Sequence, residues 1–141
     1  MSKETVVIGC GGIGCRIAPE LVGLASDDTS VTLVDRDIVE EHNLDRQFFA
    51  EEDVSRPKAG VLARSLRNHP RVRSNKVNIR AIEQYLGHPD LKDELPAPCV
   101  VFVCVDNHPA RVKSLELVDA DLSGQSLAVF AANETDSAEA Y

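Results

Sequence analysis

A glycine-rich turn near the start of the chain is the first feature whose residues could do chemistry. It reads Gly9-Cys10-Gly11-Gly12-Ile13-Gly14, and glycines let a backbone turn tightly and leave room for a phosphate to approach. Asp35 ends the next apolar run, where a carboxylate can accept hydrogen bonds from ribose hydroxyls. Together these residues predict a nucleotide site, and as a bare pattern they fit a dehydrogenase equally well.

Three elements must position these groups. An apolar run at residues 6–8 predicts a strand that enters the turn, and a second run at residues 31–34 predicts a strand that ends in Asp35. Between them, apolar residues at helical spacing predict a helix whose free N–H groups would face an anion. The apolar residues of that helix are Ile13, Ile17, Leu21 and Leu24.

The segment after the second strand shows neither a helical nor a strand period. Residues 35–49 therefore predict a long loop at the carboxyl edge of the sheet, where doubly wound folds bind their ligands. Pro57 predicts the start of a helix, with Lys58 in a first turn where the helix dipole does not favour a cation. We expect Lys58 either to face an anion or to be a solvated surface lysine. The inward-facing residues of this helix are Ala59, Leu62, Ala63 and Leu66.

The rest of the chain predicts one domain over residues 1–141, with 131–141 as a truncated or frayed end. The predicted fold class is α/β, a Rossmann-like, doubly wound, mainly parallel sheet with helices on both faces. Asp106 follows a continuous apolar strand, where it could hold a metal ion or cap the next helix. The further strands are predicted at residues 72–79, 100–105 and 126–131, and the further helices at 82–86 and 109–122.

Composition excludes several classes of partner. The formal net charge of the 141 residues is −8, so we expect no nucleic-acid binding, which needs a basic surface. No apolar run reaches membrane-spanning length and no signal segment precedes the first strand, which predicts a cytoplasmic protein without membrane contact. No Cys-x-x-Cys pair occurs, so we expect small, buried, reduced cysteines at Cys10, Cys15, Cys99 and Cys104.

An ordered set of motifs extends beyond the glycine turn. The set resembles the adenylation domain of the ThiF/MoeB superfamily, which includes the ubiquitin-activating enzymes. The resemblance runs from the first strand to about Arg111. Its motifs are the double glycine Gly11-Gly12, then Asp35-x-Asp37-x-Val39, Asn43-Leu44-x-Arg46-Gln47, Lys58-Ala59, and Asp106-Asn107 with Arg111.

The resemblance implies an activity and the residues that perform it. ATP, with Mg²⁺, would activate the C-terminal carboxylate of a ubiquitin-like or sulfur-carrier protein as an acyl-adenylate, with release of pyrophosphate. The implied catalytic residues are Arg46, Lys58 and Asp106, of which Asp106 would bind magnesium. The implied nucleotide-binding residues are Gly9, Gly11, Gly12, Gly14, Asp35, Asp37, Asn43, Arg46, Gln47 and Lys58, with Asp35 on the ribose hydroxyls and Asn43, Arg46 and Lys58 on the triphosphate.

The chain also departs from the family pattern. Family members usually carry a helix before the first strand, and its arginine reaches the triphosphate of a neighbouring subunit, whereas the first strand here starts almost at Met1. Arg16 could partly substitute or could be a solvated arginine, and His42 stands where the family often has serine. We therefore expect a homodimer or a heteromeric subunit, which is either the nucleotide half of a longer product or a minimal relative.

Two alternatives to an adenylating enzyme remain open at this point. One is a non-catalytic subunit of an activating complex that binds nucleotide or only dimerises, although such subunits commonly lose residues retained here. The other is an NAD-binding oxidoreductase domain, which accounts for the glycine turn and Asp35 but gives no role to Asn43, Arg46 or Lys58.

Overall fold

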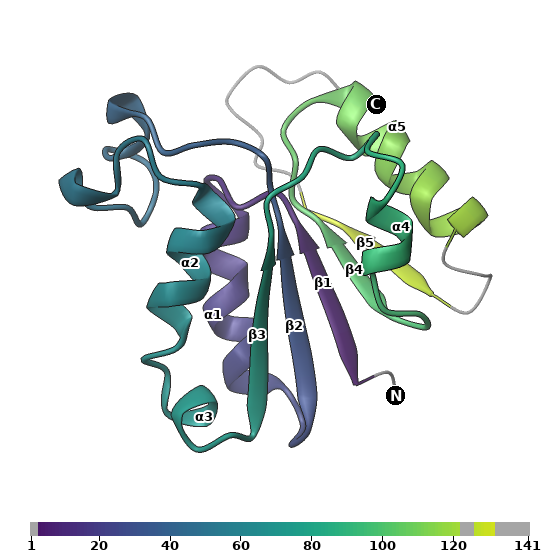
Figure 1. The fold of residues 1–141 in the computed structure, drawn as a ribbon, viewed down its shortest axis with the longest axis horizontal. Coiled ribbons are helices and arrows are strands. Elements are labelled where there is room, and N and C mark those ends of the chain that lie inside the picture. The colour runs from purple at the N-terminus through teal and green to yellow at the C-terminus, as the bar shows by residue number, and fades with distance from the viewer. Residues whose placement is uncertain (1–2, 122–125, 132–141) are drawn as a thin grey trace.

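The computed structural model describes residues 3–121 and 126–131. Their strands form one five-stranded sheet in the order β3-β2-β1-β4-β5, and every neighbouring pair is parallel (Figure 1). This confirms the predicted Rossmann-like α/β fold. Of the predicted truncated or frayed end at 131–141, residues 132–141 lie outside the described residues. The strands are β1 (Glu4–Ile8), β2 (Thr29–Val34), β3 (Val77–Ile82), β4 (Val100–Val103) and β5 (Leu127–Phe130).

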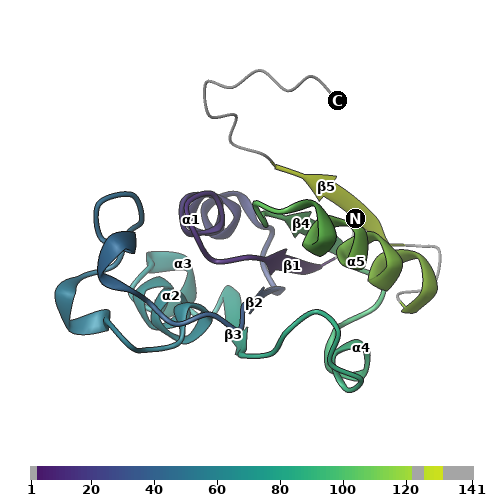
Figure 2. The ribbon, with the colours of Figure 1, turned by 90° about the horizontal axis from the view of Figure 1, so that it is seen from above.

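Helices cover both faces of the sheet (Figure 2). On one face lie α1 (Gly14–Leu24), α2 (Lys58–Leu66) and α3 (Pro70–Arg73), and on the other lie α4 (Leu91–Glu94) and α5 (His108–Glu116), which continues as a π-helical turn (Leu117–Asp121). Successive side chains of β1 enter opposite layers, so Val7 packs toward α1 and α2 while Val6 and Ile8 pack toward α4 and α5. Each such buried side chain contributes roughly 1.5–3 kcal/mol to folding.

Two predicted elements are wrong. Residues 72–79 were predicted as a strand, but the chain forms α3 first and enters β3 only at Val77. Pro70 starts this helix, the His69 ring accepts a hydrogen bond from the Arg71 amide, and Asn75 turns the chain with a φ of 57°. No helix forms at 82–86, because Ile82 is the buried end of β3, and the next helix is α4.

Smaller differences concern the ends and faces of correctly predicted elements. Apolar spacing predicted Leu24 on the inner stripe of the first helix, but Leu24 is 84% exposed and the smaller Ala18 and Val22 are fully buried there. The predicted strand at 100–105 ends at Val103, and the predicted strand at 126–131 spans Leu127–Phe130. The predicted helix at 109–122 begins at His108 and changes to π-helical geometry after Glu116.

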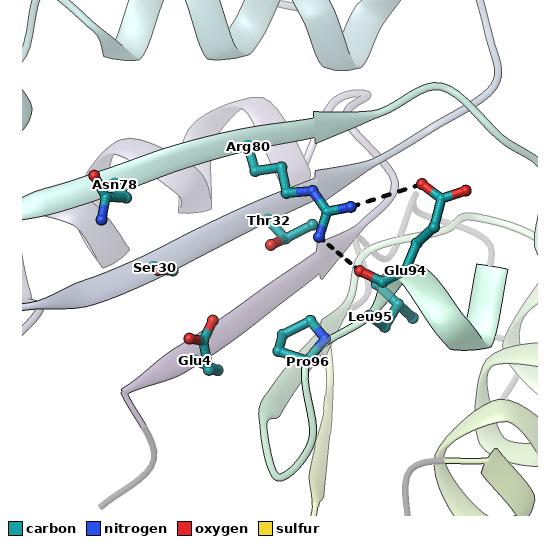
Figure 3. A pocket seen from close by; sticks show the side chains of 8 residues that line it. All are labelled: Glu4, Ser30, Thr32, Asn78, Arg80, Glu94, Leu95 and Pro96. Atoms are coloured by element: carbon teal, nitrogen blue, oxygen red, sulfur yellow. Dashed lines mark hydrogen bonds and ion pairs between the residues drawn. The ribbon is translucent and has the colours of Figure 1, made fainter.

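Part of the sheet face beside α4 is polar, which explains the weak strand signal of β3. Figure 3 shows a groove of about 340 Å³ over β1, β2 and β3, with polar side chains on its floor. Arg80 crosses it and donates a hydrogen bond of 2.7 Å to the Glu94 carbonyl, which ties β3 to the end of α4. The polar residues of the floor are Glu4, Ser30, Thr32 and Asn78.

Candidate nucleotide site

The sheet has a topological switch point between β1 and β4, where the direction in which the chain winds through the sheet reverses. The chain passes from β1 to β2 and β3 in one direction and from β4 to β5 in the other. The carboxyl ends of β1 and β4 lie side by side, with Ile8 paired to Val103. Doubly wound folds bind ligands in the crevice at this point, and both the glycine turn and Asp106 follow directly from these strand ends.

Two glycines of the turn are required by close packing of backbone. Gly9 has a φ of +94°, and a Cβ there would stand 3.0 Å from the carbonyl carbon of Cys104. A Cβ on Gly14 would overlap the carbonyl oxygen of Gly9. These contacts hold the turn against β4 and bring the start of α1 to the switch point.

The other two glycines face outward. A Cβ on Gly12 would meet nothing within 4 Å, and one on Gly11 would stand 3.5 Å from Nε2 of Gln47. The first turn of α1 contains no acidic residue. The amides of Cys15, Arg16 and Ile17 already donate to carbonyls of the turn, so an anion would bind at the amides that precede Cys15. The turn therefore has a packed side and an open side, and the open side can accept a phosphate.

Asp35 is fixed by two backbone donors. Its Oδ2 accepts a hydrogen bond of 2.7 Å from the Cys10 amide, and its Oδ1 accepts one of 2.8 Å from the Asp37 amide. Burial raises the pKa of Asp35, and these two hydrogen bonds and the Lys58 charge act in the opposite direction. A carboxylate has about four acceptor positions, so each oxygen keeps one that these backbone donors do not use. Asp37 lies beside it and pairs with Arg36 at 3.8 Å.

Lys58 is held at the start of α2 by a short antiparallel contact with the loop after β2. Its amide donates to the Asp37 carbonyl at 2.9 Å, and Ile38 pairs with Pro57. The residue as a whole is 8% exposed, and in the described part of the chain no carboxylate lies within ion-pairing distance of the ammonium. Lys58 is therefore a largely buried residue whose ammonium has no counterion among the described residues, and its role toward an anion stays a prediction.

The loop at 35–49 forms as predicted, with a 3-10 turn (Glu41–Asn43) inside it. Asn43 is buried, and its Oδ1 accepts a hydrogen bond of 2.9 Å from the Glu40 amide. The side-chain oxygen of Asn43 thus stabilises the loop, while its side-chain NH₂ group is not used in that hydrogen bond. Arg46 is exposed, whereas the Oε1 of Gln47 is buried without a hydrogen-bond partner. This oxygen lies beside Gly11 and is an acceptor open to a hydrogen-bond donor.

Asp106 follows β4 and is exposed. The Oδ1 of Asn107, not Asp106, caps α5 by accepting a hydrogen bond of 2.9 Å from the Ala110 amide. The alternative of Asp106 as helix cap is therefore wrong, and its carboxylate is available. Arg111 donates to the Val105 carbonyl at 3.2 Å and so braces the segment that carries Asp106.

The donor set around Asp106 fits one kind of Mg²⁺ site, in which a carboxylate binds the ion together with phosphate oxygens and water. Among the described residues no three acidic, histidine or cysteine side chains converge on a metal position. Mg²⁺ commonly uses one or two carboxylates, with phosphate oxygens and water completing its shell. A single carboxylate at the switch point fits that form when a nucleotide is bound.

All four cysteines are free and buried, as predicted. Burial raises the pKa of the Cys104 thiol to about 11, and burial together with the nearby Asp35 raises that of Cys10. Neutral thiols are poor nucleophiles and poor metal ligands, so Cys10 and Cys104 serve packing beside the glycine turn.

The fold brings some predicted residues together and leaves others apart. The glycine turn, Asp35, Gln47 and Lys58 form one connected group on the β1–β2 side, while Arg46 and Asp106 are exposed beside it. Sequence reasoning missed a contact of Arg16 with Phe48, whose ring centroid lies 5.4 Å from the guanidinium carbon. No local pattern signals this pairing, since it joins a helix to a distant loop.

Comparison with known sequences places the chain among relatives of one kind. The chain is 32% identical over 112 residues to the sulfur carrier protein ThiS adenylyltransferase of Escherichia coli. The aligned segment makes up 79% of this chain and 42% of that protein. The chain is 31% identical over 113 residues to the SAMP-activating enzyme E1 of Haloferax volcanii, covering 79% and 39%. It therefore spans about two fifths of the length of these relatives.

Solved structures and a family comparison agree with this result. MccB of Escherichia coli, solved with MccA, matches with a TM-score of 0.72 and 25% identity over 94% of this chain and 37% of MccB. MccB solved with ATP matches with a TM-score of 0.61 and 26% identity over 82% of this chain and 32% of that one. The model of the ThiF family matches residues 2–120, and this chain belongs to the ThiF family.

Proposed function

We propose that this chain is the ATP-binding adenylation domain of an enzyme that activates the C-terminal carboxylate of a ubiquitin-like or sulfur-carrier protein. Family membership supports this proposal, as do relatives named for activating SAMP and for adenylating the sulfur carrier ThiS. The structural match to MccB solved with ATP supports the choice of nucleotide.

One observation carries the proposal beyond a general nucleotide site. Lys58 is 8% exposed as a residue, and its ammonium has no carboxylate within ion-pairing distance among the described residues. Its amide donates to the carbonyl of Asp37, two residues after Asp35, at 2.9 Å, so Lys58 lies near the carboxylate that is proposed to bind the ribose. The glycine turn already serves one phosphate group through its N–H donors. A cation without a counterion outside the turn favours a ligand with a longer chain of phosphates.

The reaction proposed for this site is an in-line displacement at the α-phosphorus. A carboxylate oxygen of the carrier forms a bond to phosphorus while the bond to the oxygen that bridges to the β-phosphate breaks. Pyrophosphate leaves with that electron pair. Negative charge grows on the leaving group, so fixed cations lower the barrier. Lys58 and Arg46 are proposed to supply that charge, and Asp35 is proposed to fix the ribose.

Asp106 is proposed to hold Mg²⁺ together with phosphate oxygens. When bound, the metal ion would supply charge stabilisation to the phosphates. The chain's own contribution is an exposed carboxylate whose neighbour Asn107 carries the capping role, so Asp106 is free to bind or release a ligand without disturbing α5.

Nucleotide titrations test this function directly. Calorimetry should give tighter binding of ATP with Mg²⁺ than of NAD, and ATP–pyrophosphate exchange should depend on a carrier protein that ends in a free carboxylate. The same carrier with an amidated C-terminus is the matched control. Tighter, magnesium-independent binding of NAD would show that the glycine turn belongs to an oxidoreductase. Tight ATP binding without exchange in the full-length protein would favour the non-catalytic subunit.

We also propose that the chain works with another copy or a second subunit. β5 is an edge strand of the described sheet, and its Leu127, Val129 and Phe130 are 61%, 36% and 42% exposed. An exposed apolar edge strand is open to pairing with another chain. Light scattering coupled to size exclusion should therefore give more than the monomer mass, and exchange should rise with protein concentration. A monomer whose exchange is independent of concentration would contradict this proposal.

A further inference from the structure

The contact between Arg16 of α1 and Phe48 of the loop after β2 has no role in the steps above. The Arg16 guanidinium carbon lies 5.4 Å from the ring centroid, within the range of cation–π attraction. In the described residues Arg16 has no ion-pair partner. It lies in the first turn of α1, where the helix dipole disfavours a cation. Nothing in the local chain therefore explains a cation there, and the ring is the group it contacts.

Phe48 belongs to a short segment that carries two predicted site residues, Arg46 and Gln47. On one side, Gln47 packs against the glycine turn, with its Nε2 3.5 Å from the position of a Cβ on Gly11. On the other side, Phe49 is 8% exposed and joins a small apolar cluster under the loop. Phe48 lies between these two anchors and is itself 66% exposed. Its ring gains little from burial, and its contact with Arg16 adds a direct tie between this segment and α1.

We propose that Arg16 is a positioning residue that acts through Phe48. It holds the segment bearing Arg46 and Gln47 across the glycine turn, so that the nucleotide meets a site already assembled. Preorganisation of this kind raises affinity because the loop loses less conformational freedom on binding. The inference rests on the proposed function where it concerns ATP, and the loop itself can be measured without any ligand.

A competing role for Arg16 is direct contact with phosphate, because it lies in the first turn beside the open side of the glycine turn. The two roles differ in what they ask of Phe48. If Arg16 acts through the ring, removing either partner has the same effect and removing both adds nothing. If Arg16 binds phosphate itself, the ring is irrelevant.

A double-mutant cycle on ATP affinity, measured by calorimetry with Mg²⁺, separates these roles. We expect Arg16→Ala and Phe48→Leu each to weaken binding by roughly two- to fivefold, the size of an exposed cation–π contact. The double variant should be no weaker than either single variant, and Phe48→Tyr should keep the affinity of the unaltered protein. Arg67→Ala is the control, since Arg67 is an exposed arginine at the end of α2 with no ion pair in the described residues.

Hydrogen exchange in the ligand-free protein tests the same contact independently of function. The amides of residues 46–49 should exchange faster in Arg16→Ala and in Phe48→Leu, while the midpoint of thermal unfolding of Arg16→Ala does not fall, because a cation has been removed from a helix start. Unchanged exchange of these amides would overturn the proposal. A loss of affinity in Arg16→Ala without one in Phe48→Leu would also overturn it. If the unaltered protein fails to bind ATP, the proposed function fails, and the amide hydrogen exchange of residues 46–49 alone decides whether Arg16 positions the segment.

Discussion

The two flanks of the switch point prepare the carboxyl edge of the sheet in different ways. On the β1–β2 flank the predicted ligand groups are tied to backbone: Asp35 accepts amide hydrogen bonds of 2.7 and 2.8 Å, and the Lys58 amide donates one of 2.9 Å. On the β4–β5 flank Asp106 is exposed, and the capping of α5 falls to its neighbour Asn107.

This difference separates fixed groups from free ones. Groups that must recognise a nucleotide benefit from rigid placement, because little entropy is then lost on binding. A carboxylate that holds a metal ion together with a bound phosphate benefits from having no competing hydrogen bond in the folded protein. The first flank should therefore respond to substitution through both the fold and affinity, and the second flank mainly through chemistry.

The largest effect is expected on the packed side of the glycine turn. In Gly14→Ala the new Cβ would overlap the Gly9 carbonyl oxygen, so we expect a loss of about 3 kcal/mol in unfolding free energy together with loss of nucleotide binding. Gly12→Ala is the matched variant, because its Cβ meets nothing within 4 Å. It should fold normally and weaken nucleotide binding only. Urea unfolding and calorimetry measure both, and equal stability of the two variants would contradict the packing argument.

Lys58→Met tests whether the Lys58 charge on the β1–β2 flank acts on the phosphates of ATP. It keeps an apolar stem in a position that is 8% exposed and removes the charge, so ATP affinity should fall by roughly 1.5–3 kcal/mol, the cost of losing a charged contact. The free protein should be no less stable, since a cation without a counterion has been removed. Calorimetry with ATP and with adenosine provides the readout and its control. A fall in adenosine affinity of the same size would show that Lys58 does not act on the phosphates.

Asp106→Ala and Asn107→Ala form a neighbouring pair on the second flank. Asn107→Ala removes the cap of α5 and should lower the unfolding free energy by about 1 kcal/mol. Asp106→Ala should change it by less than about 0.5 kcal/mol but abolish magnesium-dependent ATP–pyrophosphate exchange. Should Asp106→Ala instead destabilise the domain and keep its exchange activity, Asp106 would be a structural residue.

The smallest effect concerns pH. Burial raises the pKa of Asp35 above its ordinary value of 3.8, so the folded protein holds this proton more tightly than the unfolded chain. The contribution of Asp35 to stability is therefore fully present below pH 3.8 and is lost as pH rises through the raised pKa. As pH rises through this range, the unfolding free energy of the unaltered protein should fall relative to that of Asp35→Ala. Urea unfolding at a series of pH values measures the difference, and an unchanged difference would contradict the raised pKa.

Much of the fold could be predicted from local patterns. The apolar runs that became β1, β2 and β4 are nearly continuous, as parallel strands buried on both faces must be. Ala59, Leu62, Ala63 and Leu66 are all buried as the helical period of α2 predicted. β3 was misplaced because it lies at the edge with a partly polar face, so its alternation is weak, and because a short helix with a His69 cap precedes it.

The sequence by itself determined the parallel α/β architecture, the glycine turn and the acid at the end of the second strand, because apolar periodicity and turn chemistry act within a few residues. Only the tertiary structure decided that Asn107 caps α5 and leaves Asp106 free, that Lys58 is nearly buried, and that Phe48 lies under Arg16. These outcomes depend on contacts between segments far apart in the chain. The sheet creates them by bringing its carboxyl ends to one edge, and no local pattern records which side chains meet there.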